Sequence, residues 1–194
     1  MLRILFVALG LSIAFPALGD DSEDGPMMTI TAEQSDVYLE APQFLIAKAT
    51  FHRQRIHKDR GLRDLAIYRA LGEISTIMYD TLDPDIVGSM MKGESTEDTL
   101  RVLNWFLPKD YRFALGATGE HRNQITTLPY QHVRLTWPGG GGNCIVYFRA
   151  FDPQPGRSTS TKRLGGIYCR TIDQMNEQLT AAFFDGIRIK QRQP

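Results

Sequence analysis

The fold is decided by two stretches of sequence, Cys144-Ile145-Val146-Tyr147-Phe148-Arg149-Ala150 and Gly166-Ile167-Tyr168-Cys169. Along the first stretch apolar residues alternate with neighbours that face the other way, which is the two-residue period of a β-strand. Residues 111–115 and 133–137 alternate in the same way. Turn-forming stretches separate these segments: 116–123, 139–142 and 152–162. Because short connections favour antiparallel pairing, the sequence predicts an antiparallel sheet of about four strands over residues 111–170.

The N-terminus has the order of a secretory signal peptide. A basic residue, Arg3, precedes the apolar run 4–15 and the small-residue site Ala17-Leu18-Gly19. The run is shorter than the roughly 20 residues that a membrane-spanning helix needs, so a retained anchor is the weaker alternative. We therefore predict three parts: a signal peptide at 1–19, a flexible acidic leader at 20–36 and a single α+β domain at 37–194. We expect no transmembrane segment after cleavage.

Cys144 and Cys169 are the only cysteines in the chain. In an exported protein an even number of cysteines is most simply explained by a disulfide. Placing the two opposite each other on neighbouring strands sets Val146 against Ile167 and suits the geometry of a disulfide. Closing a loop of about 25 residues stabilises a fold by about 3–4 kcal/mol in the chain-entropy model. The alternative is a pair of buried free thiols. There is no C-x-x-C motif, so we expect a structural bridge without redox chemistry.

Helices are predicted around this sheet, at residues 42–60, 62–82, 95–107 and 172–184. The segment 62–82 is the clearest, because its apolar residues recur at spacings of three and four. The segment 42–60 has a proline near its start and a glycine past its end, as helices do, although Ala47, Ala49 and Phe51 also alternate as in a strand. The order of elements predicts an α+β fold, in which N-terminal helices and one C-terminal helix pack on the sheet.

The charge of the chain argues against one class of partner. Lys and Arg together number 22, as do Asp and Glu, so the formal net charge is zero. No global field attracts nucleic acid, and we expect no nucleic-acid partner. The sequence predicts no metal site and no cofactor, because it has neither a His-Glu-x-x-His motif nor a Cys/His cluster.

Three residues are weak candidates for catalysis: Glu120, His121 and His132. Glu120 and His121 lie in a predicted loop, where a carboxylate and an imidazole occur together. Adjacent residues of an extended chain point to opposite sides, so they are more simply surface residues. The Ser-x-x-Lys arrangement at Ser89 and Lys92 lacks its companion motifs and is expected by chance. An enzyme is therefore less favoured than a binding protein.

Five basic residues are weak candidates for binding: Arg53, Arg55, Lys58, Arg60 and Arg149. The first four belong to the most basic stretch of the chain, which on a helix would form either a solvated face or a site for an acidic partner. Arg149 alternates with Tyr147 and Phe151 and could share a binding surface with them.

Three functions remain open from the sequence. The first is an exported, soluble accessory or binding protein of the cell envelope, periplasmic or extracellular, whose partner is an envelope protein or an anionic envelope component. The second is a small hydrolase with a site assembled around His121 and His132. The third is a carrier of a small ligand, which needs a pocket between helices and sheet.

Overall fold

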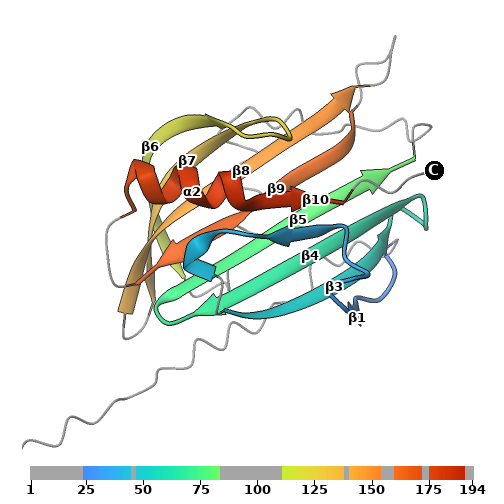
Figure 1. The fold of residues 1–194 in the computed structure, drawn as a ribbon, viewed down its shortest axis with the longest axis horizontal. Coiled ribbons are helices and arrows are strands. Elements are labelled where there is room, and N and C mark those ends of the chain that lie inside the picture. Colours follow the sequence, from blue (N-terminus) through green and yellow to red (C-terminus); the bar gives the residue numbers. More distant parts are fainter. Residues whose placement is uncertain are drawn as a thin grey trace, which may run out of the picture.

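A computed structural model describes residues 24–44, 47–83, 111–137, 140–153, 160–171 and 175–190 of the chain (Figure 1). Strands account for 67% of these residues. The main sheet has eight antiparallel strands in the order β1-β3-β4-β5-β9-β8-β7-β6. Their bounds are Met28–Ile30 for β1, Lys48–Ile56 for β3, Gly61–Ala70 for β4, Glu73–Leu82 for β5, Arg112–Arg122 for β6, Thr127–Trp137 for β7, Gly140–Pro153 for β8 and Ser160–Arg170 for β9.

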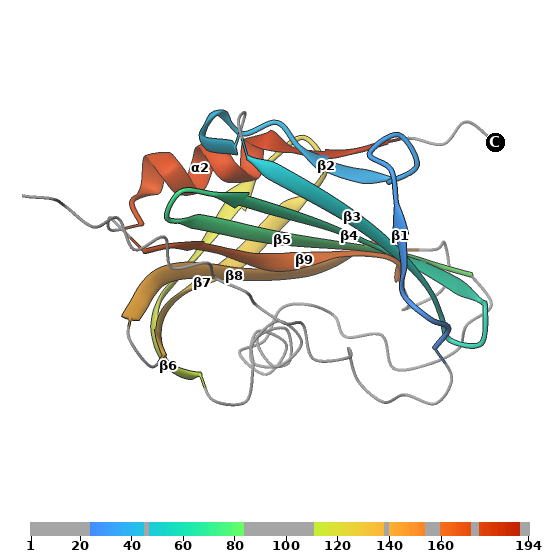
Figure 2. The same cartoon turned by 90° about the horizontal axis from the view of Figure 1, so that it is seen from below.

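A second layer covers one face of this sheet (Figure 2). It contains the helix α2 (Glu177–Gly186), the short 3-10 helix η1 (Pro42–Phe44) and a two-stranded sheet of β2 (Val37–Leu39) and β10 (Ile187–Ile189). The core between the layers is aromatic. Four of its largest side chains are fully buried: Tyr147, Tyr168, Phe183 and Phe184. The second layer is also tied by polar contacts, since the backbone N–H of Leu39 donates to the Tyr68 hydroxyl at 2.8 Å.

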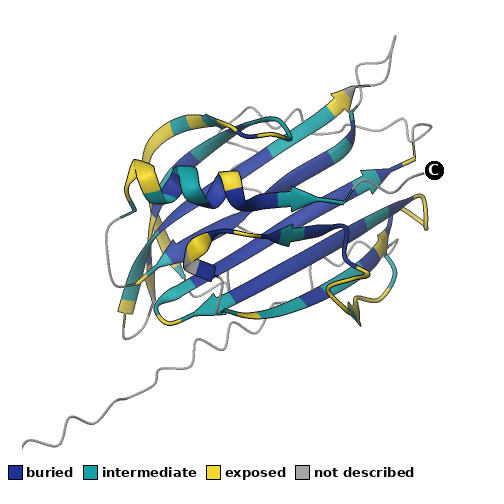
Figure 3. Cartoon of the chain, in the orientation of Figure 1, coloured by how far each residue is buried: buried dark blue, intermediate teal, exposed yellow. Residues whose placement is uncertain are grey.

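The predicted α+β fold with N-terminal helices and a four-stranded sheet is wrong. The segment 62–82, predicted as the clearest helix, forms the hairpin of β4 and β5, and Gly72 takes a positive φ of 72° in its turn. Both strands lie inside the sheet and are buried along most of their length (Figure 3). A strand that is buried on both faces has no alternation to reveal it, so apolar residues at three- and four-residue spacings resembled a helix.

The segment 42–60, also predicted as a helix, contains η1 and the strand β3. The alternation of Ala47, Ala49 and Phe51 was the correct signal there. The predicted helix at 95–107 and the Ser89/Lys92 pair lie outside the described residues.

The C-terminal helix is confirmed in α2, which begins at Glu177. The side-chain oxygen of Asn176 caps it by accepting a hydrogen bond from the N–H of Leu179 at 2.9 Å. The alternating segments between residues 111 and 170 are confirmed as parts of the strands β6 to β9. The turn predicted at 116–123 is wrong, because β6 continues to Arg122 and includes Glu120 and His121.

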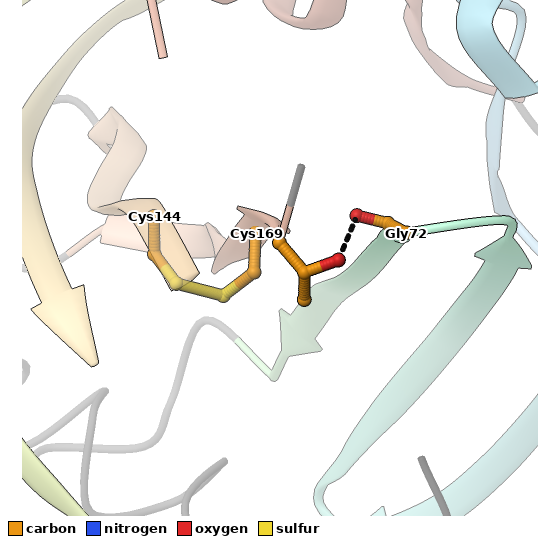
Figure 4. Close-up of a disulfide and its surroundings, with 4 residues drawn as sticks. Gly72, Cys144 and Cys169 are labelled. Carbon is orange, nitrogen blue, oxygen red and sulfur yellow. Dashed lines mark hydrogen bonds between the residues drawn. A yellow bond between two sulfur atoms is a disulfide. The ribbon is translucent and has the colours of Figure 1, made fainter. Parts of the chain in front are cut away.

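The predicted disulfide is confirmed. Cys144 of β8 and Cys169 of β9 are bonded, and their Cα atoms lie 4.0 Å apart (Figure 4). The strand register is the predicted one, with Cys144 opposite Cys169 and Val146 opposite Ile167. Next to the bond, the Thr171 hydroxyl donates to the carbonyl of Gly72 at 3.2 Å, which ties the end of β9 to the β4–β5 turn.

Paired backbone begins within the predicted leader, residues 20–36. The strand β1 pairs with β3 from Met28 to Ile30, and the N–H of Gly25 donates to the carbonyl of Arg55 at 2.8 Å. Among the described residues, no helix is long and apolar enough to cross a membrane.

Candidate ligand pocket beside the β6 edge

A pocket of about 410 Å³ lies where β6, β7 and β8 meet the chain that leads into α2. Its walls come from all of these parts: Ala114 and Gly116 of β6, His132 and Arg134 of β7, Asn143 of β8, and Met175 ahead of α2. The strand register explains the grouping. Ala114, Arg134 and Asn143 are paired across the three strands, and paired residues project from the same face of a sheet.

Gly116 allows the strands to come close at this point. The register of β6 and β7 shifts between Leu115 and Thr118, which marks a β-bulge beside the pocket. A Cβ atom on Gly116 would lie 3.2 Å from both the Cβ and the carbonyl oxygen of His132. A side chain at this position would therefore push β6 away from His132 and change the wall of the pocket.

His132 is half-buried in the wall of the pocket, and this burial lowers the pKa of its imidazole. The ring of Tyr130 meets it edge-on, with centroids 5.5 Å apart. A histidine with a lowered pKa is mostly neutral at pH 7, so each ring nitrogen can serve as a hydrogen-bonding group.

The pocket carries a positive charge. Arg134 is exposed, and the residues described as lining the pocket include no carboxylate. Asn143 adds an amide that can donate and accept hydrogen bonds. This combination suits an anionic ligand with further polar groups. The described lining residues include no serine or threonine to act as a nucleophile, and the sulfur of Cys144 is in the disulfide. Within the described ranges, no group of acids, histidines or cysteines could hold a metal ion.

His121 does not share this pocket. Its Nε2 lies 2.7 Å from Oδ1 of Asp185 on α2, and its ring stacks on Phe184 with centroids 5.6 Å apart. Phe184 also meets Tyr130 at 5.4 Å. The two histidines therefore stand at opposite ends of a row of rings, His121, Phe184, Tyr130 and His132, and they do not form one catalytic site.

Glu120 is exposed, and its strand position places it on the opposite face of β6 from His121. The structure therefore does not bring Glu120, His121 and His132 together.

The basic stretch forms a hairpin instead of a helix face. Arg53 of β3 binds Asp64 through two nitrogens at 2.6 and 2.7 Å, and these hydrogen bonds raise the pKa of the guanidinium. Its Nη2 also donates to the carbonyl of Gln34 at 2.8 Å, so Arg53 ties the chain before β2 to the sheet. Arg53 thus has a structural role.

Three other basic candidates lie at or near the β3–β4 turn. Arg55 is 61% exposed and lies 3.9 Å from Asp59, and Arg60 is 47% exposed and lies 3.5 Å from Asp83. Lys58 is exposed in the turn itself. The two arginine contacts are exposed ion pairs of small energetic weight. Nothing in the geometry of these three residues assigns them a ligand.

Arg149 lies on β8 on the same face as Tyr147. Tyr147 is fully buried beneath α2, where its ring meets Phe183 and Phe184. Of the expected surface of Tyr147, Arg149 and Phe151, Tyr147 is therefore part of the core, while Arg149 and Phe151 are half-buried.

Sequence reasoning missed most of the pocket. Arg134 and Asn143 could have been found, because the hairpin of residues 133–137 with 144–150 places them opposite each other. Gly116 and Met175 gave no such signal, since the bulge and the path into α2 are set by the tertiary structure.

A buried ion network was also missed. Asp80 of β5 is fully buried and accepts from Arg63 at 2.9 and 3.1 Å and from Arg163 at 2.5 Å. Burial by itself raises the pKa of Asp80, but the charges and hydrogen bonds of the two arginines outweigh it and hold the pKa below its ordinary value. These three residues link β4, β5 and β9, so the ion network has a structural role.

Comparison with known protein families and with curated proteins found no match for this chain.

Proposed function

We propose that this protein is an exported binding protein that holds an anionic group in the pocket of His132, Arg134 and Asn143. The observation that carries the proposal is the composition of the pocket wall: an exposed cation, an imidazole and an amide, with no acid among the described lining residues. A cavity with a few convergent polar groups on an apolar wall is the usual form of a small-ligand site. Ala114 and Met175 supply apolar side chains to that wall.

Binding is favoured over hydrolysis by the placement of the histidines. A hydrolase built on His132 needs a nucleophile or a carboxylate beside it, and the described lining residues offer neither. His121 has a carboxylate partner in Asp185. The side chain of Asp185 is 62% exposed, and the ring of His121 stacks on Phe184, so this pair lies outside the pocket of His132.

Export is supported by two independent features. Residues 1–19 have the order of a signal peptide, and the only two cysteines of the chain form a disulfide, a bond that persists in oxidising compartments. We propose that the protein acts in the periplasm or outside the cell.

The proposal is tested by titrating the protein with N-acetylglutamate while recording backbone amide spectra. We expect shifts at Arg134, Asn143 and Met175. Arg134→Gln should weaken binding about tenfold or more, because a charge-assisted hydrogen bond is lost. Arg55→Gln is the matched control, since Arg55 is also an exposed arginine but lies on β3. An equal loss in both variants, or no shift at the pocket in the wild type, would contradict the proposal.

The pH dependence of the same titration gives a second readout. An anion beside His132 stabilises the imidazolium, whose pKa is lowered in the free protein. Arg134 is the charged residue among the described pocket lining. Binding should therefore tighten as pH falls from about 7.5 to about 5.5, and His132→Asn should remove most of that dependence.

A further inference from the structure

Among the strands that the structure describes, β6 is the last of the main sheet and pairs on one side, with β7. It is long, at 11 residues, and nearly all of them are exposed. The outer side of such a strand presents a row of backbone N–H and C=O groups that an added strand can pair with. Proteins use this mode to bind extended peptides, with the backbone supplying affinity and side-chain pockets supplying specificity.

The side chains of β6 indicate which kind of segment could bind along this strand. Phe113 and Leu115 project from one face and are 42% and 40% exposed, which is unusual for large apolar residues in this molecule. Arg112 and Arg122 are exposed near the two ends of the strand, and Arg134 is exposed on the neighbouring strand, whereas Glu120 is the exposed acid of β6. The edge is therefore apolar with a net positive charge, and it complements an acidic segment with alternating apolar residues.

The pocket adjoins this edge. Ala114, Leu115 and Gly116 of β6 belong to its wall, so a strand added along β6 would lie next to the pocket mouth. A carboxylate side chain of the added strand would then lie on the side of Arg134.

A buried acceptor without a partner lies beside the bulge of β6, on the opposite face of β7 from His132 and Arg134. Gln131 is 6% exposed, and its Nε2 donates to the carbonyl of Gly116 at 3.4 Å, while its Oε1 has no hydrogen-bond partner. Gln131 is paired with Thr118 of β6, on the far side of the bulge. A buried acceptor left without a donor is unfavourable, so the bulge is a locally unfavourable point of this edge.

We infer that β6 is a docking edge for an extended acidic segment of a partner protein, which adds a strand to the sheet and directs a carboxylate to the pocket. The inference rests on the proposed function for the role of Arg134, and on the exposed edge of β6 for the mode of binding.

A second copy of this chain fits the edge less well. A second copy would bring two edges of net positive charge together, whatever the register of the two β6 strands. In the symmetric antiparallel pair centred between Leu115 and Thr118, for example, the guanidinium of Arg112 would face the imidazole of His121. The edge is therefore better suited to a partner of complementary charge.

The test uses a fluorescently labelled peptide of alternating glutamate and valine, with a lysine and valine peptide as its counterpart. We expect the acidic peptide to bind by fluorescence anisotropy, and the basic peptide not to bind. Hydrogen exchange of the outward amides of β6 should slow by about tenfold or more in the complex, because added strand pairing protects them.

Phe113→Glu should weaken binding of the acidic peptide about tenfold or more, because it removes an apolar contact and adds a like charge. Leu71→Glu is the matched control: it also replaces an exposed apolar residue, at 93% exposure, in the turn between β4 and β5. Thermal unfolding of both variants checks that each folds. The hydrogen-exchange test on the wild type needs neither variant, so it remains valid if a variant does not fold.

Four outcomes would overturn the inference in different ways. If N-acetylglutamate binds and the peptide does not, or if the peptide binds without protecting β6, the pocket proposal stands and strand addition is wrong. If β6 is protected without peptide and sedimentation shows a dimer, the occupant is a second copy. If neither ligand binds, the proposed function fails together with the inference.

Discussion

The strands β5 and β6 have nearly the same length, 10 and 11 residues, but they occupy opposite environments. In β5, which lies between β4 and β9, eight residues are buried, including Asp80. In β6, which ends the sheet, nine residues are exposed, including Phe113 and Leu115. A charge is therefore buried in one strand and large apolar groups are exposed in the other. The number of neighbouring strands, more than the local composition, decides which strand supports the fold and which is open to a partner.

The largest effect should follow from breaking the ion network inside the central strands. Asp80→Asn removes the carboxylate that compensates Arg63 and Arg163 and leaves both guanidinium groups with a neutral partner. We expect the free energy of unfolding to fall by about 3–5 kcal/mol, as for other buried pairs that lose one partner. Urea denaturation measures it. The control is Asp59→Asn, whose carboxylate is 65% exposed, and it should change stability by less than about 0.5 kcal/mol.

The same ion network makes the free energy of unfolding depend on pH. The pKa of Asp80 is lowered in the folded state, so its stabilising contribution is present above its unfolded pKa, at about 3.9, and is lost as pH falls through the folded pKa. The stability difference between the wild type and Asp80→Asn should therefore be constant near neutral pH and shrink in strong acid. A difference that stays constant down to the lowest pH at which both fold would contradict this assignment.

The next effect concerns the disulfide, which joins β8, on the side of the open edge, to the central strand β9. Replacing Cys144 and Cys169 together by serine should lower the free energy of unfolding by about 3 kcal/mol, because the unfolded chain regains the freedom of a 25-residue loop. Wild-type protein under reducing conditions is the control and should lose a similar amount. A loss below about 1 kcal/mol in both would show that the bond does not hold this part of the sheet.

A smaller effect, of opposite sign, is expected in the β3–β4 turn. His57, Lys58 and Asp59 all have positive φ angles, 53°, 55° and 67°, a conformation that favours glycine. His57→Gly should therefore raise the free energy of unfolding by about 0.5–1 kcal/mol. His52→Gly, inside β3, is the control and should lower it by a similar amount or more. If both substitutions destabilise, the turn carries no strain that glycine relieves.

The smallest effect is expected at the edge. Phe113→Thr replaces a half-exposed ring by a good strand former, so the free energy of unfolding should change by about 0.5 kcal/mol or less. Binding of the acidic peptide should nevertheless weaken. Unchanged binding, or a large loss of stability, would mean that Phe113 serves the fold and not a partner.

Sequence reasoning succeeded where the two cysteines fixed the register between two strands. The alternation of β8 and β9 and the two cysteines located this strand pair, including Val146 opposite Ile167. It failed at β4 and β5, because strands buried on both faces lose the two-residue period that identifies strands. For the pocket, the sequence pointed to His132 without its neighbours, because Arg134 and Asn143 join it only once the register between β7 and β8 is known. Met175 could not be predicted, because its place depends on how the chain crosses from β9 to α2.

The strand order also has a consequence for the way in which the chain acquires its fold. Neighbours in sequence are neighbours in the sheet for β3-β4-β5 and again for β6-β7-β8-β9, so each series can form from local hairpins. The two series meet where β5 pairs with β9, as Glu73 does with Arg170. This pairing closes the long stretch of chain between residues 73 and 170, and closing so long a loop is slow. During synthesis the N-terminal series is made first, and β5 has no partner on that side until β9 exists. A strand that is deeply buried in the finished protein is thus an exposed edge while the chain is incomplete, and we expect aggregation of the nascent chain to begin there, not at β6.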